Sequence, residues 1–467
     1  MCPPVGSSTA QSSQLQINDH ILIEWFKKNY KRILFARMRK YDSYGRTDIL
    51  SKAIERLNPD KDLFDQKNEV EDIWRNLVGK AIVYLKSKDR REKYHDGEDY
   101  GVERLHKFFK TFRQFEALLY GVEEERYRDH MTHMLSVFLL GDYLIRQRIG
   151  FENIDVNDEN LPTDKRVSAA EKEAMWCIMS LTHDLGIALE KIPALNPKVQ
   201  VMLEQFGIID IKALSYPFPR QPLHDLMIRF LSSDLWPTAG GAGRSFITHL
   251  QSKYFLKFSE ALERRDHGLV SCLVLMKNLV YFLETDFLLD THKPFDIEDA
   301  RQFLIRRNIL RSIAAHNCRN IYHLTVPQFP FLLTTFDEMH EWGRPRFVEM
   351  FEKKRPTTVV TVEDLSTTAV HYKIRLKCEE TLTREEKTRM SKETKEYFRS
   401  KCEKIRMILR SAVGGKDRNL KLTLEVVDEI QPTIKCYKTI HETPENIKIS
   451  EDNQEITWLE FLKKLES

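Results

Sequence analysis

The sequence predicts a mainly helical protein with a smaller C-terminal α+β domain. Apolar residues recur with helical spacing from Ile21 to about residue 350, as in helices that bury one face. After Arg355 and Pro356 the spacing of apolar residues changes to two, which is typical of a strand with one buried face. The chain has 467 residues, more than a single hydrophobic core usually supports, so we expect two or three folding units.

Four segments follow from these patterns. Residues 1–19 are rich in Ser, Gln and Pro and predict a disordered tail. Residues 20–100 predict an N-terminal helical segment, and residues 101–350 predict the main helical domain. Within this domain, residues 215–222 and 237–245 interrupt the helical pattern with Pro and Gly, so we expect an irregular insertion or a connecting loop there.

Residues 356–467 predict an accessory α+β domain of order β-β-α-β-β. Residues 370–378 alternate between apolar and basic side chains, and residues 420–426 and 433–440 predict further strands. Between them, residues 383–409 predict a charged helix with one apolar stripe. Small units of this kind often associate through their sheet edges, so we expect a homo-oligomer by analogy between folds.

The composition excludes strong bulk attraction to charged partners. Hydrophobic residues make up 42% of the chain, and its formal net charge is only +3. The first 16 residues contain no Lys or Arg, so a secretory signal peptide is not expected. The strongest apolar run, residues 268–283, contains Lys277 and Asn278 and is shorter than the roughly 20 residues of a membrane span. It therefore predicts a buried helix.

The spacing of the cysteines indicates the cellular compartment of the protein. All seven are scattered along the chain, and no two of them form a C-x-x-C pair. This spacing disfavours both a disulfide framework and a zinc knuckle. Free thiols fit a reducing compartment, so we expect a cytoplasmic protein without a membrane partner.

The stretch LTHDLG, residues 181–186, places a histidine beside a carboxylate at the end of an apolar run. Residues 174–179 are apolar, and His183 and Asp184 follow. Polar groups buried without partners cost several kcal/mol. Two other His-Asp pairs lie at 95–96, in a polar turn, and at 224–225, near the start of an expected helix. Only the pair at 183–184 requires a metal ion or hydrogen-bond partners.

Residue types that commonly bind metals, His and Asp, occur at comparable places on other apolar segments. His130 and His133 lie one helical turn apart before one apolar run, His267 precedes a second, His316 ends a third, and Asp337 follows a fourth. Taken singly, each histidine is best explained as a hydrogen-bonded core residue. Taken together, these residues predict four or five apolar helices that converge on one site.

This order, H…HD…H…H…D, resembles that of the HD-domain metal-dependent phosphohydrolases, in particular members whose longer ligand set holds two metal ions. The resemblance covers about residues 101–350, and its most specific parts are H-x-x-x-V at His133, HDLG at 183–186 and DHGLVS at 266–271. It implies an all-helical core in which Asp184 bridges a binuclear site. One ion would be bound by His133, His183, Asp184 and Asp337, and the other by Asp184, His267 and His316.

The resemblance also implies a chemistry for this site. Imidazole and carboxylate suit two divalent transition metal ions, either Mn, Fe, Ni, Co or Zn, which a bridging carboxylate keeps about 3.5 to 4 Å apart. Water between the ions would lose a proton near neutral pH and attack phosphorus as hydroxide. Asp184 is therefore expected to be catalytic as well as a ligand.

Four further residues are assigned around the ligands. His130, one turn before His133, is expected to orient a ligand rather than to bind metal. Many family members continue the HD pair with x-G-K, but this chain has Ile187 after the glycine. Lys191, one turn further on, either supplies the missing charge as a catalytic residue or lies at the surface. The other two residues are Arg344 and Arg346, which either bind phosphate or cap a helix end.

We therefore expect a hydrolase that cleaves a phosphate ester, such as a nucleotide, a phosphomonoester or a phosphodiester. A first alternative is a regulator that binds a nucleotide with slow or no turnover. A second is a nuclease directed to nucleic acid by a basic strand face, for which a solvated surface is the favoured interpretation. That face consists of His371, Lys373, Arg375 and Lys377.

Overall fold

The computed structural model describes the chain in segments that are separated by gaps. The described residues are 15–37, 49–61, 63–89, 100–119, 129–204, 222–238, 245–283, 294–318, 321, 327–342, 357–366, 369–377, 383, 385, 392, 394–404, 421–428, 435–441, 447–452, 454–457, 459–461 and 463.

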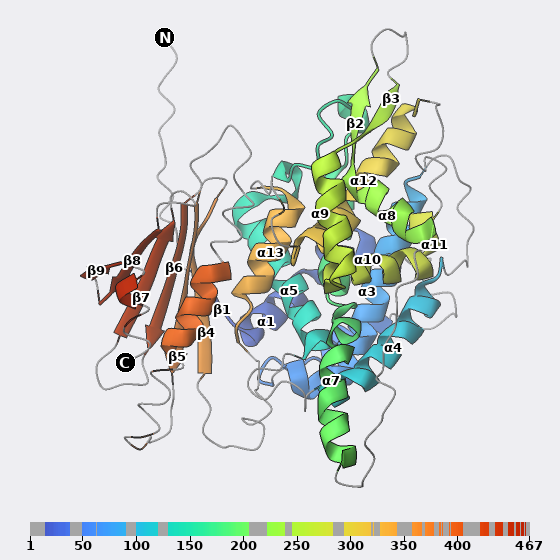
Figure 1. Ribbon diagram of the computed structural model, residues 1–467. Coiled ribbons are helices and arrows are strands. Elements are labelled where there is room, and N and C mark those ends of the chain that lie inside the picture. Colours follow the sequence, from blue (N-terminus) through green and yellow to red (C-terminus); the bar gives the residue numbers. More distant parts are fainter. Residues whose placement is uncertain are drawn as a thin grey trace, which may run out of the picture.

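A helical body lies beside a β-sheet (Figure 1). This arrangement confirms the predicted fold class, a mainly helical part followed by a C-terminal α+β part. The helices are α1 (Asp19–Asn29), α2 (Ile49–Arg56), α3 (Lys67–Ser87), α4 (Val102–Leu119), α5 (His130–Leu144), α6 (Ala169–Thr182), α7 (Ile187–Glu204), α8 (Pro222–Ser232), α9 (Ser252–Glu263), α10 (His267–Asn278), α11 (Val280–Leu283), α12 (Ile297–Ala315) and α13 (Phe329–Met339).

The strands form one large sheet and one hairpin. They are β1 (Leu15–Ile17), β2 (Ser233–Pro237), β3 (Phe246–Leu250), β4 (Thr357–Leu365), β5 (Ala369–Lys377), β6 (Lys421–Asp428), β7 (Lys435–His441), β8 (Ile447–Glu451) and β9 (Gln454–Ile456). The large sheet has the order β1-β4-β5-β6-β7-β8-β9, whereas β2 and β3 pair with each other. The edge strand β1 therefore comes from the opposite end of the chain to its neighbours.

Strand β1 differs from the expectation for the N-terminal segment. Residues 1–14 lie outside the described residues, but Leu15–Ile17, expected in the disordered tail, pair antiparallel with β4. Asn18 then caps α1, because its side chain accepts a hydrogen bond from the N–H of Ile21 (2.9 Å). Local composition does not reveal this strand because its partner is distant in the sequence.

Helices α5 and α6 are buried on nearly all sides and form the centre of the body. Trp176 of α6 donates its indole N–H to the carbonyl of Phe138 in α5 (3.2 Å). Trp74 of α3 donates to the carbonyl of Leu181, in the last turn of α6 (2.6 Å). The middle and the C-terminal end of α6 are thus held by neighbouring helices through buried hydrogen bonds.

The C-terminal unit confirms the predicted order β-β-α-β-β and extends it with β8 and β9. Residues 394–404 are helical between β5 and β6, and these two strands are parallel, as a helical crossover requires. Phe398 and Cys402 of this helix are buried. Lys401 binds Glu338 of α13 (Nζ to Oε2, 2.9 Å), so the crossover helix connects the sheet to the helical body.

The hairpin β2–β3 lies where the sequence predicts an irregular insertion. Trp236 pairs with Ile247 and Ser233 with Leu250, while residues 239–244 of the glycine-rich stretch lie outside the described residues. The apolar run at 268–283 forms two helices, which extended backbone at Leu279 separates. Residues 268–276 of α10 are buried, as the sequence predicts, whereas Val280 and Leu283 of α11 are exposed.

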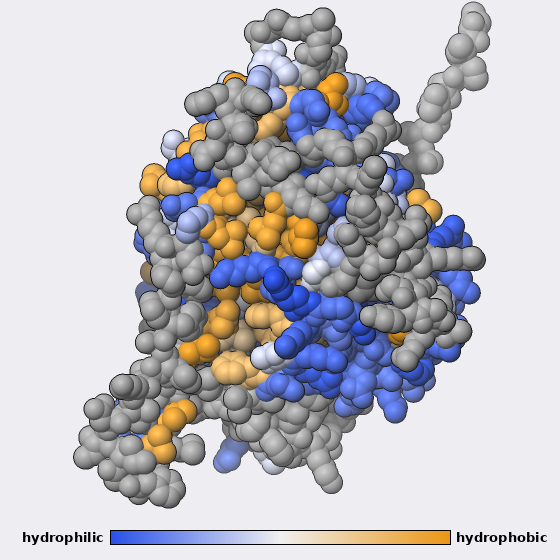
Figure 2. Space-filling view, turned by 90° about the vertical axis from the view of Figure 1, so that its right-hand side faces the viewer, coloured by the Kyte–Doolittle hydropathy of each residue, from blue (hydrophilic) through white to orange (hydrophobic). Residues whose placement is uncertain are grey.

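The face of the body that carries α8 and α11 has an apolar area with hydrophilic residues below it (Figure 2). Val280 and Leu283 of α11 are among the exposed large apolar side chains, a common feature of protein surfaces. In the part of the chain that the structure describes, no helix is both long and apolar enough to cross a membrane.

Candidate metal centre

The ends of five helices converge on a buried cluster of four histidines and two aspartates. His133 lies in the first turn of α5, and His267 begins α10. His183 and His316 are the residues directly after α6 and α12, and Asp337 lies in the last turn of α13. Asp184 follows His183 in the turn that leads to α7. The convergence predicted from the sequence is therefore confirmed.

Three of these helices direct their C-terminal ends toward the cluster. The last carbonyl groups of a helix carry a partial negative charge, which favours a cation near them. Helices α6, α12 and α13 all end at cluster residues. The backbone therefore adds to the negative potential of the two carboxylates.

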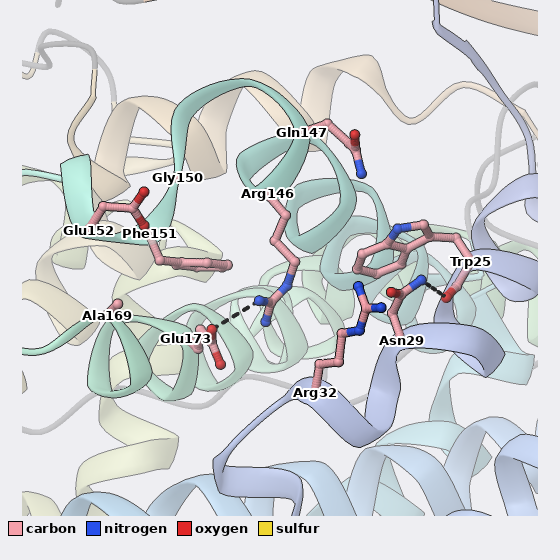
Figure 3. A pocket seen from close by; sticks show the side chains of 10 residues that line it. All are labelled: Trp25, Asn29, Arg32, Arg146, Gln147, Gly150, Phe151, Glu152, Ala169 and Glu173. Carbon is pink, nitrogen blue, oxygen red and sulfur yellow. Dashed lines mark hydrogen bonds and ion pairs between the residues drawn. The ribbon is translucent and has the colours of Figure 1, made fainter.

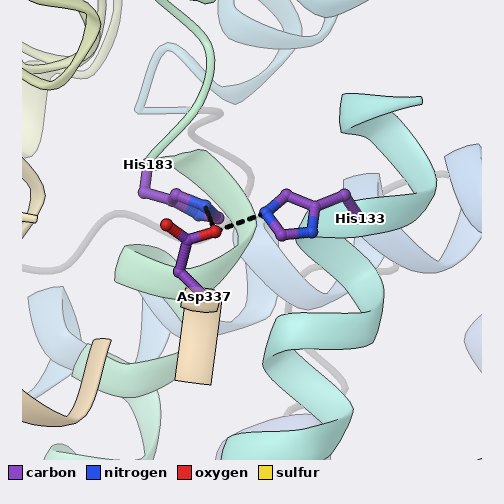
Figure 4. A group of neighbouring side chains, drawn as sticks. All are labelled: His133, His183 and Asp337. Atoms are coloured by element: carbon purple, nitrogen blue, oxygen red, sulfur yellow. Dashed lines mark hydrogen bonds and ion pairs between the residues drawn. The ribbon is translucent and has the colours of Figure 1, made fainter. Parts of the chain in front are cut away.

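The first half of the cluster surrounds one oxygen of Asp184. Its Oδ2 lies 3.6 Å from Nε2 of His133 and 3.5 Å from Nε2 of His183. Asp337 completes this half, with Oδ1 at 2.8 Å from His133 Nε2 and at 4.0 Å from His183 Nε2 (Figure 4). The side chains of His133, His183 and Asp337 are close enough to share one metal ion.

The second half surrounds the other oxygen of Asp184. Its Oδ1 lies 3.3 Å from Nε2 of His267 and 3.5 Å from Nε2 of His316. The two Nε2 atoms are 3.0 Å apart. The two halves therefore meet at Asp184, whose oxygens face different pairs of histidines. His183, Asp184 and His316 also lie close enough together to hold an ion.

The hydrogen bonds of two histidines fit metal ligation. Nδ1 of His183 donates to the carbonyl of Ser180 (2.8 Å), and Nδ1 of His316 donates to the carbonyl of Ile313 (2.6 Å). Each Nε2 therefore has its lone pair available toward the cluster. The Nε2 of His183 is buried and has no hydrogen-bond partner among the described residues. A cation at this position would compensate that buried acceptor.

Two glutamates fix two histidines in the same way. Glu190 of α7 accepts from both the backbone N–H (2.7 Å) and Nδ1 (2.6 Å) of His267. Glu116 of α4 accepts from both the backbone N–H (2.6 Å) and Nδ1 (2.9 Å) of His130. A carboxylate on Nδ1 sets the ring orientation and makes the opposite nitrogen a better ligand. His267 thus has the support typical of a metal-ligating histidine.

His133 is oriented by a further histidine. Its Nδ1 lies 2.7 Å from Nδ1 of His340, and the two rings stack with their centroids 5.0 Å apart. His340 directly follows α13 and is buried. His130 contacts His133 edge to face, at 6.4 Å between ring centroids. His130 therefore lies next to His133, but it is His340 that shares a hydrogen bond with the His133 ring.

Two glycines permit close packing around the cluster. A Cβ on Gly186 would lie 2.2 Å from the carbonyl oxygen of His267, and one on Gly268 would lie 2.5 Å from that of Ile313. Ser271 connects the same backbone segments, since its hydroxyl donates to the carbonyl of His183 (2.7 Å) and accepts from the N–H of Gly186 (2.8 Å). At both positions, in the HDLG and DHGLVS stretches, there is thus no space for a side chain, which explains why glycine is found there.

The charges of the cluster are strongly coupled. Burial opposes ionisation of Asp184, but the surrounding His183, His267 and His316 hold the pKa of this carboxyl well below its usual range. Burial lowers the pKa of His183. Burial also opposes the charged form of His267, but its hydrogen bonds to Asp184 and Glu190 raise its pKa to about 10. Asp184 is therefore ionised at neutral pH.

Of the other predicted residues, Lys191 is described by the structure and two arginines are not. Lys191 is half-buried on α7, beside Glu190, whose carboxylate contacts His267. Arg344 and Arg346 lie outside the described residues. Sequence reasoning also missed Glu116, Glu190 and His340. His340 follows Asp337 by one helical turn, which is a usable signal, whereas neither glutamate has one.

Comparison of the chain with protein-family models, with curated proteins and with solved structures finds no match to any of them.

Proposed function

We propose that the chain is a metal-dependent phosphohydrolase of the HD type that binds two metal ions and hydrolyses a phosphate ester of a nucleotide or of another small molecule. One observation carries the proposal. The two oxygens of Asp184 face different pairs of histidines, Oδ2 toward His133 and His183, and Oδ1 toward His267 and His316. This is the arrangement of a bridging carboxylate.

The donor set supports divalent transition metals. Imidazole nitrogens suit Mn, Fe, Co, Ni and Zn, whereas Mg and Ca prefer sites made of oxygen alone. Asp337 would complete the half that contains His133 and His183. In the other half, Glu190 would orient His267 for the ion.

Bound ions would supply charge neutralisation for a phosphate group and lower the pKa of water. The residues of the chain have separate tasks. Asp184 remains ionised in its buried position because three histidines surround it. His130 is adjacent to His133, and its Nδ1 is fixed by Glu116. In its doubly protonated form, with Nδ1–H on Glu116 and a second proton on Nε2, His130 would be suited to give the Nε2 proton to the leaving alcohol.

The regulator hypothesis remains a second candidate because the cluster is connected to the sheet. Trp342 follows His340 closely and donates its indole N–H to Asp19 of α1 (2.7 Å). Residues 15–17, just before α1, form the edge strand of the sheet. A change at the cluster could therefore reach the C-terminal unit through this path.

The nuclease hypothesis is weaker. His371 lies 3.1 Å from both Glu363 and Glu425. Lys373 also contacts both glutamates, at 3.4 Å and 2.8 Å. The acidic side chains of β4 and β6 therefore offset the basic charges of β5, which reduces its attraction for a phosphate backbone.

The decisive experiment is the metal content of the purified protein, with hydrolysis of a panel of nucleotides and phosphodiesters as a second readout. We expect about two ions per chain in the wild type, and loss of both metal and activity in Asp184→Ala. Asp225→Ala is a matched control, because Asp225 belongs to the His-Asp pair of α8 and is exposed. A metal-free wild type with an equally stable Asp184→Ala variant would contradict the proposal.

Metal without hydrolysis of any phosphate ester would favour the regulator. One ion instead of two would restrict the site to a mononuclear centre and would contradict the bridging role of Asp184.

A further inference from the structure

A second pocket lies beyond the C-terminal end of α5, at the opposite end of that helix from His133. Its volume is about 320 Å³, which is within the usual range of small-molecule sites. Its lining contains no histidine or cysteine, so it differs in chemistry from the His/Asp cluster. It is lined by Trp25, Asn29, Arg32, Arg146, Gln147, Gly150, Phe151, Glu152, Ala169 and Glu173 (Figure 3).

The centre of this pocket is an arginine with incomplete partners. Arg146 donates from Nε to Asp142 (3.0 Å) and binds Glu173 through Nη1 (3.0 Å). Its Nη2 is buried and has no hydrogen-bond partner within the described segments, and the same is true of Oε2 of Glu173. Buried polar groups are rarely left in this state without a ligand or water. A ligand that offers both an acceptor and a donor would satisfy the two atoms together.

The backbone at this place is distorted in a way that widens the helix. Residues Ile145–Ile149 form a π-helix at the end of α5, a feature that is frequent at functional sites. Gly150 then turns the chain with φ of 82°, and a Cβ there would lie 2.3 Å from the side chain of Glu152. This turn brings Phe151 under Arg146, whose Cζ is 5.1 Å from the ring centroid.

The rim adds a positive charge and a flat apolar surface. Arg32 is exposed and forms no ion pair with any residue that the structure describes. Figure 3 shows its guanidinium beside Asn29 and Trp25, across the pocket from Phe151 and Glu173. Trp25 is half-buried and packs edge to face on Tyr143. The pocket thus combines the indole of Trp25, a buried donor and acceptor, and an exposed cation at its mouth.

We infer that this pocket is a second ligand site that takes a nucleoside phosphate. The base would lie against the indole of Trp25 and form hydrogen bonds to Arg146 and Glu173, while the phosphate would bind Arg32. A zwitterionic amino acid would satisfy the two inner atoms but would leave much of the volume empty. Inorganic phosphate would use only the rim.

Two of the helices that line this pocket also lead to the metal cluster. Helix α5 carries His133 in its first turn and leads directly to Arg146. Helix α6 contains Glu173 and is followed by His183. Two of the helices that a bound nucleotide would contact, α5 and α6, therefore also lead to His133 and His183 in the first half of the cluster.

Binding of adenosine and guanosine 5′-monophosphate, measured by equilibrium dialysis on the full-length chain, tests the inference. Asp184→Asn protein is used beside the wild type, so that binding at the metal cluster is separated from binding at this pocket. We expect one nucleotide per chain in Asp184→Asn and at least one in the wild type. Arg32→Ala should weaken binding about tenfold through loss of one charged contact. Lys28→Ala is the matched control, because it removes an exposed cation of α1 that does not line the pocket.

Tryptophan fluorescence provides a second readout. Nucleotide should change the emission of the wild type but not that of Trp25→Phe. Four outcomes would overturn the inference: no binding of either nucleotide, loss of binding in Asp184→Asn, equal weakening by Lys28→Ala and Arg32→Ala, or equally tight binding of inorganic phosphate alone. None of them depends on whether the metal cluster hydrolyses a substrate.

Discussion

Nε2 of His133 lies 2.8 Å from Oδ1 of Asp337, although 204 positions separate the two residues. One belongs to the first turn of α5 and the other to the last turn of α13. A contact between helix ends so distant in the chain requires that the whole helical body is folded. The cluster is therefore a product of tertiary packing, and its supporting residues can be tested one by one.

The first prediction concerns His340. Replacing it with Phe removes the hydrogen bond to Nδ1 of His133 while keeping a ring of similar size. Loss of such a support lowers metal affinity by roughly 10- to 100-fold, which competition with a chromophoric chelator would measure. His249→Phe is the control, because His249 is an exposed histidine of β3. Unchanged affinity in His340→Phe would show that its ring does not orient His133.

The second prediction concerns Glu190, which contacts His267 in only one half of the cluster. Glu190→Gln should weaken that half selectively, so that the metal content falls from about two ions per chain to about one. Glu204→Gln, at the exposed end of the same helix α7, should keep the content of the wild type. Equal loss of both ions in Glu190→Gln would contradict the division of the cluster into two halves.

The third prediction concerns how the close packing at Gly186 affects the stability of the protein. Gly186→Ala places a Cβ against the carbonyl of His267 and should lower the free energy of unfolding by about 1 to 3 kcal/mol. Ser271→Ala adds no atom and removes two buried hydrogen bonds, which should cost about 1 to 3 kcal/mol. Urea denaturation measures both effects. A Gly186→Ala variant with the stability of the wild type would mean that the segments are not closely packed.

The fourth prediction concerns pH. Burial raises the pKa of Asp142 to about 7, more than the attraction of Arg146 lowers it, and Glu173 raises it further. Between the ordinary pKa of 3.8 and about 7, the folded protein retains a proton that the unfolded chain has lost. This group therefore makes the free energy of unfolding fall as the pH rises through that range, and its effect is constant above it.

Asp142→Asn should remove this dependence, so its melting temperature should fall less than that of the wild type between about pH 5 and about pH 7. The exposed Asp225→Asn variant should behave like the wild type. Parallel melting curves for Asp142→Asn and the wild type would show that Asp142 is ionised throughout.

The sequence predicted that the histidines and aspartates of the candidate metal centre cluster because each one borders an apolar run. His183 and Asp184 follow such a run in α6, and Asp337 follows another in α13. Burial of a polar group is costly without partners, so this local contrast is informative. The fold class and the order of the C-terminal elements followed from the change of spacing after residue 356.

The supporting residues could not be predicted in this way. No motif marks Glu190 or Glu116 in the sequence, and each acts on a histidine in another helix, 77 and 14 positions away. Strand β1 has too few residues to show a period of its own, and its partner β4 lies at the other end of the chain. Such features depend on which segments meet in space, which a single sequence does not contain.

Strand β1 also has a consequence for the order in which the protein can form. Leu15 and its partner Val362 are about 350 residues apart, and contacts of such separation form late because the intervening loop must first be closed. During synthesis the edge of the sheet thus stays incomplete until β4 has left the ribosome, long after residues 15–17. We expect this first short segment of the described chain to be among the last to reach its final place.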